Sequence, residues 1–132
     1  MSNNTETKHV YLKDLHFEHK VWLNELKFYK EEVAIFEHRL DELVVRYTKM
    51  EVLAKLEQFQ NQFIREKEVI DELRHSIKQH ENGLAQFAEE HPIAIDHHYF
   101  NDHTGLRDEF VRFRELFAEL KHEFLKYLAE YM

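Results

Sequence analysis

The sequence predicts an all-α protein, an up-down-up three-helix bundle with long, coiled-coil-like helices. Glycine and proline are scarce, at two and one residues in 132, which argues against a β-rich fold with many turns. Apolar residues recur at alternating spacings of three and four, which is typical of helices packed at shallow angles. We therefore expect a single helical-bundle domain over 1–132, with residues 1–8 frayed and helices at about 10–47, 49–89 and 97–131.

The first predicted helix carries a seam in which only one position is not apolar. The seam consists of Leu12, Leu15, His19, Trp22, Leu26, Tyr29, Val33, Phe36, Leu40, Leu43 and Tyr47. A second apolar stripe, Val21, Phe28 and Ile35, lies away from this seam at seven-residue spacing, with Phe17 nearby. Three-helix packing would leave the stripe in water, and contiguous exposed apolar surface marks contact sites. We therefore expect Val21, Phe28 and Ile35 to form an interaction surface; the alternative is that they are scattered apolar surface residues, which are common.

The second seam has a different phase from the first. It consists of Val52, Leu56, Phe59, Phe63, Glu66, Ile70, Leu73, Ile77, His80, Leu84 and Phe87. Between the seams, Thr48 and Glu51 form a capping-box pattern, which favours a hairpin with Thr48 as N-cap. An axis at 49/50 then pairs each position of the first seam with one of the second. The alternative is a single continuous helix whose seam moves to another face near residue 50.

The third seam runs to the end of the chain. It consists of Tyr99, His103, Leu106, Phe110, Phe113, Phe117, Leu120, Phe124, Tyr127 and Tyr131. Pro92 ends the second helix, because proline disfavours a helical conformation in the residue before it. The third helix starts either at Asp96, which keeps His103 in the seam, or at Thr104, which the adjacent Gly105 favours.

The charge and composition exclude several classes of function. The chain has 18 basic and 26 acidic side chains and a net charge of −8, so it offers no basic face for nucleic acid. It lacks cysteine, which excludes disulfides, thiolate metal sites and thiol catalysis and fits a reducing compartment. No apolar run approaches the length of a membrane span, so we expect a soluble, cytoplasmic protein without a membrane partner. Phosphate-binding loops and nucleophile elbows are also missing from the sequence, so an enzyme is not expected.

Histidine is frequent, at 11 residues, and the hairpin arrangement places nine of them at one end. These nine are His9, His16, His19, His75, His80, His91, His97, His98 and His103. About the 49/50 axis His19 faces His80, and His103 reaches a similar height if the third helix starts at Asp96. Imidazoles and a carboxylate that converge from separate helices suit Zn²⁺ or Fe²⁺. The candidate metal ligands are therefore His19, His80, His103 and Asp102.

Two other interpretations of the seam histidines stay open. In the first interpretation, the seam histidines are neutral, hydrogen-bonded core residues that specify helix register, as other polar seam residues do. Alternatively they form a pH switch, because histidines buried in the neutral form must take up protons below an unfolded-state pKa of ~6.5. Glu18, Glu81 and Asp102 each lie beside a seam histidine and are placed to lean inward.

Glu66 is a second anomaly, a carboxylate in the middle of an apolar seam. A buried lone carboxylate is costly, so we expect a partner from the third helix, Arg112 or Arg114, or an opening of the seam at this point.

Two functional hypotheses follow. The first is a non-enzymatic helical-bundle interaction or scaffold protein, self-associating as a homodimer or binding another helical protein. The alternative is a transition-metal-binding bundle, holding Zn or Fe at the histidine-rich end formed by the start of the first helix and the connection between the second and third.

Overall fold

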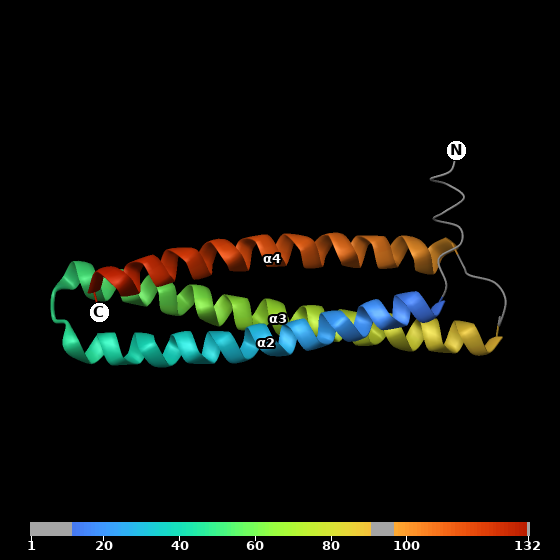
Figure 1. The fold of residues 1–132 in the computed structure, drawn as a ribbon, viewed down its shortest axis with the longest axis horizontal. Helices are drawn as coiled ribbons and strands as arrows, with labels where there is room; N and C mark the ends of the chain where they lie inside the picture. Colours follow the sequence, from blue (N-terminus) through green and yellow to red (C-terminus); the bar gives the residue numbers. More distant parts are fainter. Residues whose placement is uncertain (1–11, 91–96, 132) are drawn as a thin grey trace.

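Three long α-helices pack as a bundle in the computed structural model, which describes residues 12–90 and 97–131 (Figure 1). Helix α2 spans Leu12–Arg46, α3 spans Met50–Glu90 and α4 spans His97–Tyr131. The chain reverses direction after α2 and again after α3, so α2 and α4 run parallel and α3 runs against both (Figure 1). The predicted all-α three-helix bundle is therefore confirmed. Residues 1–8, predicted to be frayed, and Asp96 lie outside the described residues.

The turn between α2 and α3 occupies residues 47–49. The Tyr47 amide donates to the Leu43 carbonyl at 3.3 Å, and the Leu53 amide donates to the Lys49 carbonyl at 3.0 Å. The hairpin prediction is confirmed, and the continuous helix is excluded. The N-cap of α3 is Lys49 rather than Thr48, because the carbonyl of Lys49 accepts the first helical hydrogen bond. Acidic Asp14 and Glu51 in the first turns of α2 and α3 suit the positive end of each helix dipole.

The core is built from the three seams. Its buried apolar residues include Leu26, Val33, Leu40 and Leu43 from α2, Leu56, Phe63, Ile70 and Ile77 from α3, and Phe110, Phe117 and Phe124 from α4. Aromatic rings from different helices contact one another at mid-bundle, with the centroids of Phe63 and Phe124 at 4.9 Å in an edge-to-face arrangement. Each fully buried apolar side chain contributes about 1.5–3 kcal/mol to folding, so the seams supply most of the driving force. None of the described helices combines the length and apolar character needed to cross a membrane.

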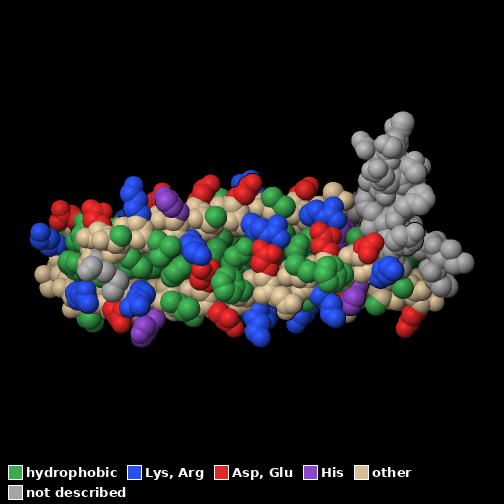
Figure 2. Space-filling view, viewed as in Figure 1, with side chains coloured by type: hydrophobic (Ala, Val, Ile, Leu, Met, Phe, Trp, Pro, Cys, Tyr) green, Lys and Arg blue, Asp and Glu red, His purple; other side chains and the backbone are tan. Residues whose placement is uncertain are grey.

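A ladder of ion pairs joins the parallel helices α2 and α4. The rungs are Glu18–Arg107, Glu25–Arg114 and Glu32–Lys121. In each rung the two residues are 89 positions apart, because both helices repeat every seven residues and run in the same direction. Arg114 donates two hydrogen bonds to Glu25, from Nε at 2.6 Å and from Nη2 at 2.8 Å. In Figure 2, basic and acidic side chains lie paired along the boundary between α4 and α2. Such pairs contribute little stability each but fix the register of neighbouring helices.

Candidate metal centre

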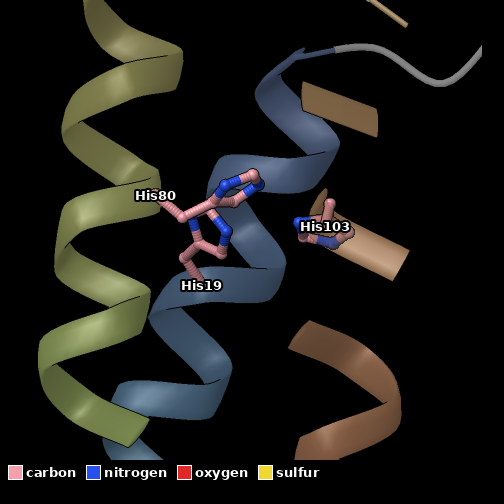
Figure 3. Close-up of side chains that lie close together, drawn as sticks. All are labelled: His19, His80 and His103. Atoms are coloured by element: carbon pink, nitrogen blue, oxygen red, sulfur yellow. The ribbon is translucent and has the colours of Figure 1, made fainter. Parts of the chain in front are cut away.

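Three histidines from three helices converge at the end of the bundle where α2 and α4 begin. His19 projects from α2, His80 from α3 and His103 from α4, and the rings point toward one another (Figure 3). One potential ligand nitrogen of each ring lies within 4.8 Å of those of the other two. The ring centroids are 5.1 Å apart for His19 and His80, and 5.0 Å apart for His19 and His103. Helix α4 begins at His97, which supports the earlier of the two predicted starts and brings His103 to this level.

This group of residues, the His trio, is enclosed by the core. The His19 and His103 side chains are 1% and 0% exposed, whereas His80 is half-buried. The Trp22 indole stacks on the His103 ring, with centroids 5.1 Å apart and an angle of 19° between the planes. The Trp22 indole also stacks with the Phe110 ring, with centroids 5.4 Å apart. The trio therefore rests on an aromatic layer, and the partly exposed His80 is its member nearest to bulk water.

Two glutamates hold two of the imidazoles. Glu81 Oε1 lies 2.6 Å from His19 Nδ1, and its other oxygen contacts His16 Nδ1 on the surface. Glu18 Oε1 lies 2.6 Å from His103 Nε2 and also accepts a hydrogen bond from Arg107. The sequence predicts that both glutamates lean inward toward the seam histidines. In the structure each glutamate contacts the imidazole of a histidine on another helix. These contacts place the first rung of the ladder against the His trio.

Asp102 was the predicted carboxylate ligand. Its side chain is exposed and is not a member of the group of close ligand atoms among the described residues. Its negative charge nevertheless acts on the trio, because it raises the pKa of His80 against the effect of burial. The structure thus brings together the three predicted histidines and places Glu18 and Glu81 where their carboxylates touch the rings.

Two buried nitrogens in the trio have no hydrogen-bond partner among the described residues. They are Nε2 of His19 and Nδ1 of His103, the nitrogens that face away from the two glutamates. An unsatisfied buried polar atom costs about 1–3 kcal/mol, and in native proteins it calls for an explanation such as a bound ion. Three imidazoles without a thiolate form a donor set that suits Zn²⁺ or Fe²⁺.

The electrostatic environment of His80 and His103 favours the neutral imidazole, which is the form that binds metal. Burial, together with the neighbouring His19 and His103, lowers the pKa of His80 to about 4. Burial also lowers the pKa of His103, although the hydrogen bond from its ring to Glu18 opposes this effect. Burial raises the pKa of Glu18, but hydrogen bonds to Arg107 and His103 outweigh it, so the net pKa of this carboxyl is lowered. At neutral pH the rings of His80 and His103 therefore carry lone pairs, while Glu18, which holds His103, is an anion.

The second apolar stripe of α2 is exposed, as predicted. Phe28 and Ile35 are 57% and 60% exposed, and Val21 is 41% exposed. Phe17, on a neighbouring position of the same helix, is 66% exposed. Figure 2 shows apolar side chains at the surface along the α2 side of the molecule. The role of Val21, Phe28 and Ile35 as an interaction surface stays a prediction.

Glu66 lies where the bundle opens between α3 and α4. Arg114, one of its two expected partners, bonds Glu25 instead, and Glu66 Oε1 is buried without a hydrogen-bond partner among the described residues. Arg112, the other expected partner, lines a groove of about 360 Å³ together with Glu66. A larger groove of about 660 Å³ adjoins Glu66 on the side of Phe59 and Leu120. Of the two explanations offered by the sequence, the opening of the seam is the one these grooves support.

No protein-family model, curated protein or solved structure matches this chain. Its function is therefore inferred from its own side chains.

Proposed function

We propose that this protein is a helical bundle that binds a transition metal ion, Zn²⁺ or Fe²⁺, through His19, His80 and His103. One observation carries the proposal: three imidazoles from three different helices offer ligand atoms within 4.8 Å of one another in a largely buried site. A metal would use the lone pairs of the two buried nitrogens that lack hydrogen-bond partners among the described residues. A packing role alone would leave those nitrogens unsatisfied, which favours the metal over the register-specifying alternative.

The metal would act as a link between helices. Each ligand comes from a different helix, so the free energy of metal binding would add directly to the free energy of folding at this end. Three protein ligands would leave a fourth coordination position open on the metal, and the burial of His19 and His103 restricts the access of bulk water to it. The pH-switch interpretation of the same histidines stays a prediction.

Elemental analysis of the untagged protein, purified without metal-affinity resin, tests the metal site. We expect about one Zn or Fe per chain, as for a mononuclear three-histidine site. His19→Ala and His80→Ala should each abolish binding, because each removes a ligand from the group. His122→Ala is the control, since His122 is exposed on α4 outside the trio and its loss should leave binding intact. Equal loss of metal from all three variants would contradict the proposal, because it would indicate nonspecific binding by surface histidines.

We also propose that the chain self-associates as a homodimer through the exposed stripe Val21, Phe28 and Ile35 of α2. The support for this proposal is the exposure of the stripe, whose three side chains are 41%, 57% and 60% exposed at seven-residue spacing.

A concentration series in analytical ultracentrifugation tests the homodimer. We expect wild-type protein to dimerise in the micromolar range and Phe28→Asp to shift the equilibrium toward monomer, because a buried charge at the centre of the stripe is costly. Leu125→Asp is the matched control, since Leu125 is an exposed apolar residue on α4, at 44% exposure. A wild-type chain that stays monomeric at high micromolar concentration would rule out the homodimer and leave another helical protein as the expected partner of this surface.

A further inference from the structure

Two imidazoles of the His trio are held by glutamates through different ring nitrogens. Glu81 engages Nδ1 of His19 at 2.6 Å, whereas Glu18 engages Nε2 of His103 at 2.6 Å. A carboxylate anion accepts hydrogen bonds and does not donate them, so in a neutral imidazole, the form that binds metal, the engaged nitrogen carries the proton and the opposite nitrogen carries the lone pair. The lone pairs therefore belong to Nε2 of His19 and Nδ1 of His103, which are the two buried nitrogens without hydrogen-bond partners among the described residues.

We infer that Glu18 and Glu81 are positioning residues of the proposed metal site, and that they fix ligation through Nε2 of His19 and Nδ1 of His103. The inference rests on the proposed function and adds to it the tautomer of each ring and the residues that select it. In metal sites a carboxylate on the distal nitrogen orients the imidazole and raises its basicity, and its removal weakens metal binding by about 10- to 100-fold.

The ladder between α2 and α4 provides an internal comparison for Glu18. Glu18 and Glu25 occupy equivalent positions on α2, seven residues apart, and each accepts two hydrogen bonds from an arginine of α4. Their surroundings differ in one respect that matters here, because Glu18 also contacts the His103 ring, whereas Glu25 contacts the Tyr29 hydroxyl. Glu25→Gln therefore removes the same kind of interhelical ion pair as Glu18→Gln without touching a ring of the trio.

Glu18 has two roles in the first rung, because its carboxylate contacts both Arg107 and the His103 ring. Arg107 donates from Nε at 2.9 Å and from Nη2 at 2.8 Å, which fixes the carboxylate in one plane. One of the two oxygens, Oε1, is shared between Arg107 and the His103 ring. Arg107 thus orients the carboxylate that orients the imidazole, and the ladder and the metal site are connected at this rung.

Zn²⁺ titration of the full apo chain against a chromophoric competing chelator provides the test. The variants are Glu18→Gln, Glu81→Gln and, as the matched control, Glu25→Gln. We expect the first two to bind Zn²⁺ about 10- to 100-fold more weakly than wild type, and the control to bind as wild type does. Long-range ¹H–¹⁵N NMR spectra of the Zn²⁺-loaded wild type should show His19 ligated through Nε2 and His103 through Nδ1.

The outcomes separate the inference from the proposed function. Wild-type protein that binds no Zn²⁺ would overturn both. Wild-type protein that binds Zn²⁺, with unchanged affinity in Glu18→Gln and Glu81→Gln, would overturn the positioning role alone. Equal weakening in all three variants would also overturn it, because the loss would then follow from weaker helix packing. Ligation through Nδ1 of His19 or Nε2 of His103 in the NMR spectra would overturn the assignment of tautomers.

Discussion

At the scale of a single side chain, Glu66 is a residue whose burial opposes folding. It occupies a seam position in α3, and one of its oxygens is buried without a hydrogen-bond partner among the described residues. Burial raises the pKa of its carboxyl, and the charge of Arg65 only partly offsets the effect. Because the folded-state pKa lies above the unfolded-state value, the folded chain binds this proton more tightly than the unfolded chain does. The ionised carboxylate therefore destabilises the fold as the pH rises through the folded-state pKa.

Glu66→Gln should raise the melting temperature at pH 7, because the amide has the same shape and no charge to desolvate. The gain over wild type should shrink as the pH falls toward and below the unfolded-state pKa, since the wild-type carboxyl then becomes protonated in both states. Thermal melts of both proteins between pH 4 and pH 7 measure this difference. Glu57→Gln, at an exposed position of the same helix, should show no such trend. A melting difference for Glu66→Gln that stays constant with pH would contradict the burial of this charge.

The orientation of side chains could not be predicted from the sequence. The seam positions of His19, His80 and His103 follow from periodicity and from the 49/50 axis, so their convergence was predictable. Which carboxylate reaches a ring depends on rotamers and on the face that each helix turns to its neighbour. Asp102, adjacent to His103 in the chain, stays exposed, whereas Glu18 reaches the His103 ring from another helix.

At the scale of the element, each helix was predictable because its signal is local. Seam periodicity and the scarcity of turn residues define α2, α3 and α4 to within a few residues. The ladder was missed, although the seven-residue spacing of its acidic residues on α2 and its basic residues on α4 is visible in the sequence. Pairing these rows requires the stagger between two helices that are not adjacent in the chain, and periodicity alone does not fix that stagger.

Gly105 is an interior helix residue that the sequence left ambiguous. It lies in α4, and a Cβ added to it would meet no atom within 4 Å. Glycine in a helix costs about 0.5–1 kcal/mol relative to alanine, because its backbone loses more conformational freedom on folding. Gly105→Ala should therefore raise the free energy of unfolding by about that amount in urea denaturation, with an unchanged m-value.

The converse substitution provides the control for Gly105. Ala118 is exposed on the same helix, so Ala118→Gly should lower the free energy of unfolding by a similar amount, about 0.5–1 kcal/mol. A destabilised Gly105→Ala variant would mean that this segment of α4 is not a regular helix near the His trio.

At the scale of the whole molecule, the two ends of the bundle are closed by different chemistry. At the end with the α2–α3 turn, the Tyr47 hydroxyl donates to the Tyr131 carbonyl at 2.5 Å, and the two rings meet edge to face. At the other end, the trio leaves two buried imidazole nitrogens without hydrogen-bond partners among the described residues. The aromatic core between them needs no ion, so the metal-free chain should still fold, with its weaker end at the trio.

Metal should therefore shift the melting temperature of a chain that is already folded. A ligand present at 100 times its dissociation constant, and bound only by the folded state, stabilises by about 2.7 kcal/mol. For a chain of 132 residues this corresponds to an increase on the order of 10 °C. Melts with Zn²⁺ and with EDTA should differ by this amount for wild type and His122→Ala, and should coincide for His19→Ala. A shift of the same size in His19→Ala would mean that Zn²⁺ stabilises the bundle from some other site, and coinciding melts for wild type would mean that the trio closes its end of the bundle without a metal.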